Sequence, residues 1–191
     1  MHIKHPYEWI SSSVYRSLFI FLFILTLLVL VALQVLGMPL MTKEAPAGIV
    51  SFEFAGDLFN ARSIKDSWGQ VGRIYAGLNL GLDFLFLVSY SSAISLGCIL
   101  VVRGMANRSG IISSLGVLIA WSQFAAAILD SVENYALIKV LLGSSNSVLP
   151  LLAKWCAIPK FIIVAAGLVF VIAGAIGIWI SLVFKRHERA A

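Results

Sequence analysis

The most regular feature of the chain is a series of four long apolar runs separated by polar segments. The runs cover residues 18–36, 74–102, 111–142 and 156–184. Each run has close to or more than the roughly 20 residues that a helix needs to cross a bilayer. Because backbone polar groups in lipid must be satisfied within the element itself, we expect all four runs to be helices. The pattern predicts an all-α integral membrane protein, a four-helix bundle that forms one membrane domain over residues 1–191.

A polar and aromatic segment, residues 1–17, precedes the first apolar run. Pro6 favours the start of a short helix at the membrane interface, which would place Trp9 and Tyr15 at the level of the lipid head groups. The run that follows, from Leu18 to Leu36, contains no charged side chain. It is longer than the apolar core of a signal peptide, which has roughly 7–15 residues. We therefore expect the first run to be an uncleaved membrane anchor.

The one long hydrophilic connection is the loop of residues 37–73, between the first and second spans. Residues 50–54 alternate between apolar and polar side chains, which predicts an extended stretch. After it, Asp57 is a candidate N-cap for a short amphipathic helix whose apolar side chains recur at helical spacing as far as Trp68. The loop is thus predicted to be partly helical and to lie on the membrane surface or on the end of the bundle.

The composition supports a membrane protein and argues against a nucleic-acid partner. Hydrophobic residues make up 60% of the chain and charged residues only 12%, about half the charged fraction of a soluble domain. The formal net charge is +5, but the basic residues are scattered and largely flank the apolar runs. We therefore expect membrane lipid as a partner and no binding of nucleic acid.

The distribution of Lys and Arg predicts how the chain is oriented. Four spans place both termini on the same side of the membrane. The segments on that side, 1–17, 103–110 and 185–191, hold seven Lys and Arg, whereas the segments 37–73 and 143–155 hold only five although they are longer in total. The positive-inside rule then places the N- and C-termini in the cytoplasm, with a bacterial inner membrane as the expected location. The loop between the first two spans would be extracytoplasmic.

Polar side chains within the third span indicate a candidate site. Asp130, Glu133 and Asn134 share one face of a helix, because Glu133 and Asn134 follow Asp130 at the i+3 and i+4 positions. Charged side chains are costly inside a membrane and usually face the bundle interior. The second span carries a comparable stripe, Asn79, Asp83 and Tyr90, and Lys160 lies near the start of the fourth span. We predict these residues, together with Trp68 and Glu53 of the loop, as the ligand-binding residues.

The depth of these residues follows from the rise of a helix. The separation along the chain from Ile111 to Asp130 is the same as that from Asp83 to Val102. At 1.5 Å per residue, both aspartates lie about 28 Å from the inner boundary, which is close to the outer boundary of a hydrocarbon core roughly 30 Å thick. Lys160 falls at the outer end of its span. The charged residues of three helices are therefore expected in one layer beneath the loop.

The charges in this layer do not balance. Asp83, Asp130 and Glu133 carry two more negative charges than Lys160 can offset, so the excess must be protonated, hydrated or matched by a cation. Arg73 could supply one positive charge if its side chain descends from the loop. Three interpretations are open at this point. The charged residues form interhelical ion pairs that fix the packing, they form an outward-facing polar pocket, or they are solvated helix ends with no pocket.

Familiar catalytic and metal-binding motifs are missing from the outer layer. The three histidines, His2, His5 and His187, are near the termini, which excludes His-ligated zinc and a Ser-His-Asp triad there. An all-oxygen site could hold Ca²⁺ or Mg²⁺, but the nearby Lys160 argues against it. We expect no cofactor and no metal.

The hypothesis that best fits these features is an outward-facing site for a small or lipid-like ligand. A membrane enzyme performing acid/base chemistry on an amphipathic substrate is one alternative. Others are a proton- or cation-coupled carrier and a non-catalytic accessory subunit. No ionisable residue continues through the inner half of the spans, which argues against a carrier.

The predicted orientation can be tested by labelling with an impermeant thiol reagent. A cysteine placed at Asn107, in the short basic loop between the second and third spans, should react only from the cytoplasmic side. Labelling of this cysteine in intact cells from outside would reverse the topology.

Overall fold

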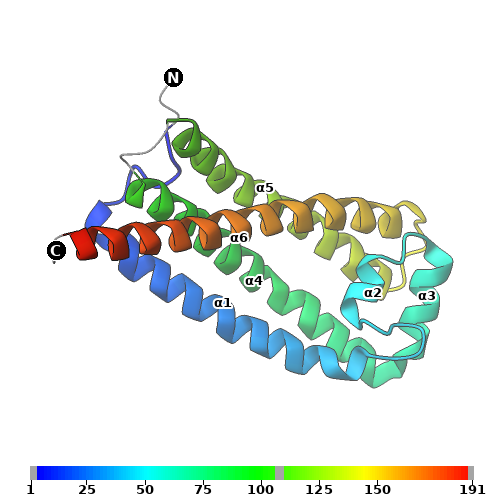
Figure 1. Ribbon diagram of the computed structural model, residues 1–191. Coiled ribbons are helices and arrows are strands. Elements are labelled where there is room, and N and C mark those ends of the chain that lie inside the picture. Colours follow the sequence, from blue (N-terminus) through cyan, green and yellow to red (C-terminus); the bar gives the residue numbers. More distant parts are fainter. Residues whose placement is uncertain (1–3, 106–109, 189–191) are drawn as a thin grey trace.

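The structure is a computed structural model, and it describes residues 4–105 and 110–188. Within these ranges it is helical and contains no strand. Four helices are long and apolar enough to span a membrane: α1 (Tyr15–Gly37), α4 (Gly69–Gly104), α5 (Gly110–Leu141) and α6 (Val148–Glu188). The prediction of an all-α four-helix bundle is confirmed (Figure 1), and the chain is a multi-pass integral membrane protein. Asn107 lies in the segment 106–109, outside the described residues.

Helix α4 is the centre of the bundle, because it packs against each of the other three long helices. Helix α5 packs against both α4 and α6, whereas α1 packs mainly on α4. Only Tyr15 and Val29 of α1 are buried. The start of α1 and the end of α6 lie at one end of the bundle, and the short helices α2 and α3 lie at the other (Figure 1). We call this second end, formed by residues 38–68 and 142–147, the loop end.

Small residues allow α6 to approach its neighbours closely. A Cβ atom added to Gly174 would overlap the side chain of Val101 on α4, and one added to Gly167 would overlap Gln123 on α5. On α5, Gly116 leaves room for Phe170 of α6 in the same way. Small residues at such contacts let membrane helices pack backbone to backbone. Gly167 and Gly174 of the last span therefore serve packing within the chain.

The loop end contains a 3-10 turn (Met38–Leu40), α2 (Ile49–Glu53) and α3 (Leu58–Ser67). The predicted cap of α3 is confirmed, since the Asp57 carboxylate accepts the backbone N–H of Asn60 at 2.8 Å. The prediction of an extended stretch at residues 50–54 is wrong, because most of it is the helical turn α2. Phe52 explains the difference, since it is fully buried and its ring lies 5.1 Å from that of Trp68. The burial of Phe52, rather than the alternation of apolar and polar side chains, determines the local conformation.

The segment before α1 also differs from its prediction. Residues 6–9 form a turn and Ser12–Val14 a 3-10 helix, so no helix starts at Pro6. The reason is that Tyr7 is buried and its hydroxyl donates to the Ser92 carbonyl at 3.0 Å, which holds the segment against α4. Tyr15 is buried as well and donates to the Tyr7 carbonyl at 2.7 Å. Among the aromatic residues expected at the interface, Trp9 is exposed.

Helix α6 begins earlier than its apolar run. The helix starts at Val148, ahead of the predicted start at residue 156. Pro150 falls in its first turn, where a proline removes no hydrogen bond that the helix would otherwise make. The connection from α5 is therefore only a few residues long, and Lys160 lies three turns inside α6 instead of near its start.

Candidate functional site

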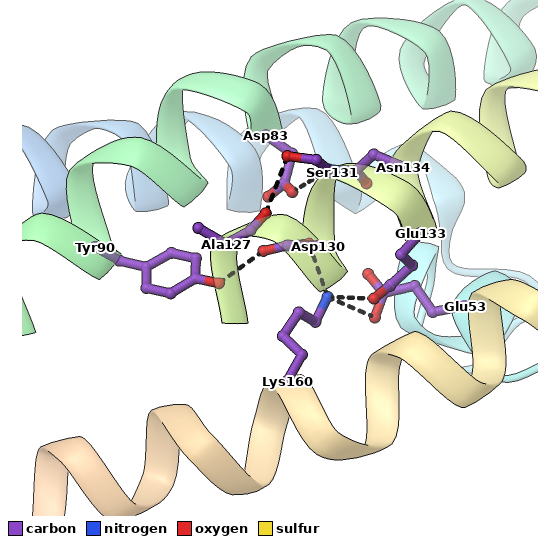
Figure 2. A network of polar contacts seen from close by, with 9 residues as sticks. All are labelled: Glu53, Asp83, Tyr90, Ala127, Asp130, Ser131, Glu133, Asn134 and Lys160. Carbon is purple, nitrogen blue, oxygen red and sulfur yellow. Dashed lines mark hydrogen bonds and ion pairs between the residues drawn. The ribbon is translucent and has the colours of Figure 1, made fainter. Parts of the chain in front are cut away.

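The side chain of Lys160 is surrounded by three carboxylates from two other elements. Its ammonium nitrogen lies 2.8 Å from Glu133 Oε2 and 2.9 Å from Asp130 Oδ1, both on α5. Glu53 of α2 is at 3.9 Å. Glu133 is completely buried and Lys160 is 6% exposed. Figure 2 shows the carboxylates converging on this one nitrogen, so the charge of Lys160 is fully compensated within the protein.

Two further hydrogen bonds connect this ion cluster to α4. Asp130 Oδ2 accepts a hydrogen bond from the Tyr90 hydroxyl at 2.9 Å. Asp83 Oδ2 accepts one from the Asn134 amide at 2.5 Å (Figure 2). Asp83 therefore lies opposite Asn134, which follows Asp130 by one helical turn on α5, so the two aspartates lie in the same layer but not directly opposite each other. Asp130, Glu133 and Asn134 do share a face, and that face is turned to the bundle interior.

The remaining predicted residues are distributed around the cluster. The Asn79 amide donates to the Leu33 carbonyl of α1 at 2.9 Å and so ties α1 to α4. Trp68 lies apart from the site, because it is buried in the apolar core of the loop end and donates to the Leu40 carbonyl at 2.8 Å. Arg73 does not descend to the cluster, since it pairs with the exposed Asp66 at 2.8 Å.

Glu53 brings a fourth acidic group to a site that already has an excess. Burial raises the pKa of the Glu53 carboxyl, and the attraction of Lys160 opposes this rise only in part. Glu53 therefore takes up a proton more readily than a glutamate in water. The site as a whole combines four carboxyl groups, those of Glu53, Asp83, Asp130 and Glu133, with one ammonium group.

The site lies at one end of a large cavity between α1 and α6. The cavity has a volume of about 750 Å³ and is lined mainly by apolar side chains. Asn79, Asp83, Tyr90, Asp130, Asn134, Lys160 and Glu53 all line it, whereas Glu133 and Trp68 do not. At the opposite end, Phe19 and Val171 both approach Gly97 of α4, at 3.2 and 3.1 Å from where its Cβ would be. We call this cavity the α1–α6 groove.

Sequence reasoning missed the contribution of α1 to the groove. The α1 lining consists of Phe19, Phe23, Thr26, Leu27, Leu30, Leu33, Gln34 and Gly37. Apolar residues cover the whole surface of this helix, so periodicity cannot separate a groove-facing side from a lipid-facing one. The one available signal is the pair Thr26 and Gln34, which are polar and share a face because Gln34 is at the i+8 position from Thr26.

Comparisons with known proteins add no functional information. No family model, curated protein sequence or solved structure matches the chain. In the part of the chain that the structure describes, no group of three His, Cys, Asp or Glu side chains is arranged to hold a metal ion. The groove and its polar end are therefore the features that bear on the function.

The ion cluster predicts different effects of removing its positive and its negative members. Lys160→Met leaves buried carboxylates without their cation, at a cost of roughly 3–5 kcal/mol in the free energy of unfolding. Glu133→Gln keeps the Lys160–Asp130 pair and removes one excess negative charge, so it should cost only about 1 kcal/mol. The measurement is the thermal unfolding midpoint of the purified variants.

The matched control is Lys139→Met, the same substitution at an exposed position of α5 whose ammonium lies over the Tyr135 ring. It should leave the midpoint nearly unchanged. Equal losses of stability in the Lys160 and Glu133 variants would contradict the assignment of Lys160 as the single compensating charge.

Proposed function

We propose that this protein binds a single-chain, lipid-like amphiphile in the α1–α6 groove. The observation that carries the proposal is that one cavity joins an apolar channel to a buried polar cluster. Its volume of about 750 Å³ lies within the range of roughly 300–1,000 Å³ that is typical of ligand pockets. Such a shape fits a molecule with an apolar chain and a polar head.

The position of α1 supports entry of the ligand from the bilayer. This helix packs mainly on α4, and the Leu27 side chain on the edge of the groove is 45% exposed. At the loop end, Ile49, Val50 and Glu53 of α2 line the groove and cover its polar part. A ligand would therefore enter sideways between α1 and α6, with its head group under α2 and its chain toward the middle of the membrane.

The charge distribution supports an outward-facing position for the polar end. The excess of Lys and Arg in the segments on the side of the termini favours cytoplasmic termini. In that orientation the loop end lies on the outer side of a bacterial inner membrane. The head group would then be taken from the outer leaflet.

The wall of the groove also supports a second candidate function, that of an acid/base enzyme acting on the same bound amphiphile. Tyr90, Asp130 and Lys160 form a hydrogen-bonded chain in the wall of the groove, and such a chain can move a proton to or from a bound head group. A coupled carrier is disfavoured, because the described groove lining contains no titratable side chain between Tyr90 and the closed end at Phe19.

Adjacent leucines on α1 provide a sharp test of ligand binding. Leu27 lines the groove, whereas Leu28 is 64% exposed and does not line it. Leu27→Trp should fill the groove and lower the occupancy of a co-purified amphiphile by roughly tenfold or more, because overpacking costs about 1–3 kcal/mol. Leu28→Trp should leave the occupancy unchanged.

The occupancy can be measured by native mass spectrometry of each variant released from membranes in which it was expressed. Equal occupancy in the two tryptophan variants would contradict the proposal. So would a wild-type protein that carries no amphiphile.

A further inference from the structure

We infer that the head group recognised in the α1–α6 groove is a positively charged amine, with Asp83 as its counter-ion. This inference rests on the proposed function and specifies the ligand class. The groove would thus bind a long-chain cationic amphiphile rather than a phosphate- or carboxylate-bearing lipid.

The polar end of the groove offers no free positive charge to a ligand. Lys160 is the only basic residue among the described residues that line the groove, and three carboxylates surround its ammonium. Arg73, which the sequence offered as a second positive charge, pairs with Asp66 on the surface. An anionic head group would therefore meet carboxylates without a cation to bind, which is unfavourable in a buried site.

Asp83 presents to the groove a carboxyl group that has no cationic partner among the described residues. Asp83 lines the groove, and its hydrogen-bond partner is the neutral Asn134 amide. No ion pair formed among the described residues includes Asp83. An ammonium group beside it would gain a charge-assisted hydrogen bond.

The polar end of the groove also lacks a hydrogen-bond donor at Glu53. Glu53 lines the groove, and its buried Oε2 atom has no hydrogen-bond partner among the described residues, with Lys160 at 3.9 Å. Figure 2 shows its carboxyl group directed into the cluster. Buried acceptors normally have partners, and a head group that carries N–H donors would complement this acceptor. Glu133 does not line the groove and would not contact the head group.

Aromatic side chains line the groove on the same stripe of α4 as Asp83. Phe86 and Tyr90 follow Asp83 on one stripe of α4, with ring centroids 5.1 Å apart and planes inclined by 55°. Both line the groove, and Phe161 of α6 lines it as well. Aromatic faces attract cations, and together with a carboxylate they form the usual recognition surface for ammonium groups.

The apolar part of the groove accounts for the chain of the ligand. On α4 the lining continues from Asp83 to Ile94, which corresponds to about 16 Å at 1.5 Å per residue. From Tyr90 to Ile94 this lining contains no charged side chain. An alkyl chain extending from an ammonium at Asp83 would run along it.

Photo-crosslinking with three matched probes tests this inference. The probes are dodecylamine, dodecanol and dodecanoate, each with a diazirine at the far end of the chain, and they are applied at neutral pH to the full protein in nanodiscs. Crosslinks on groove residues are mapped by mass spectrometry, which separates them from probe that is merely dissolved in the bilayer. We expect the amine to reach half-maximal labelling of the groove at a concentration about tenfold lower than the alcohol, and the acid to label it least.

Asp83→Asn should remove the advantage of the amine and leave labelling by the alcohol unchanged, which also shows that the variant is folded. The matched control Asp66→Asn, at an exposed position outside the groove, should behave as wild type. Preference for the acid, or an amine preference that survives in Asp83→Asn, would overturn the inference. Equal labelling by all three probes would also overturn it while leaving the proposed function intact, whereas no groove labelling by any probe would end the proposed function itself.

Discussion

The compensation of several buried carboxylates by the single ammonium group of Lys160 is the constraint on which the arrangement of the bundle depends. Lys160 connects α6 to α5 through Asp130 and Glu133, and it reaches α2 through Glu53. Asp130 extends the connection to α4 through the Tyr90 hydroxyl. One positive charge thus links four elements of the described chain at one level.

Helix α1 contributes no residue to this network, which leaves the groove open between α1 and α6. Near the loop end its polar connection to the bundle is the bond from Asn79 to the Leu33 carbonyl, and its other contacts are mainly apolar contacts with α4. Among the described residues no side-chain hydrogen bond or ion pair joins α1 to α6, and a space lined by both helices remains between them. At the end of that space away from the ion cluster, Phe19 and Val171 both lie close to Gly97.

A purely structural role explains the cluster less well than a binding role does. A buried ion pair often stabilises a protein no more than apolar side chains of similar size, and small residues such as Gly174 already provide close packing of the helices. A packing device would also be expected to balance its charges. The site instead retains a carboxylate, Asp83, that lines the groove and has no cationic partner among the described residues. Intramembrane charges of this kind usually mark functional sites.

The sequence predicted the parts of this site that follow from regular geometry. Constant helical rise placed Asp83 and Asp130 in one layer, where the structure has them within about one helical turn of each other. The helical period placed Asp130, Glu133 and Asn134 on one face. The sequence could not predict what depends on single tertiary contacts, such as the helical turn around Phe52 or the docking of Tyr7 on α4. For α1, lipid and groove are both apolar environments, so its hydrophobic pattern carried no information about which side lines the cavity.

An experimental structure of the protein in nanodiscs made from its own membrane lipid tests most directly whether the groove binds an amphiphile. We expect an elongated density in the groove, with its head beside Asp83 and its chain between α1 and α6 as far as Phe19. An empty groove, or one closed by α1 packed against α6, would contradict it.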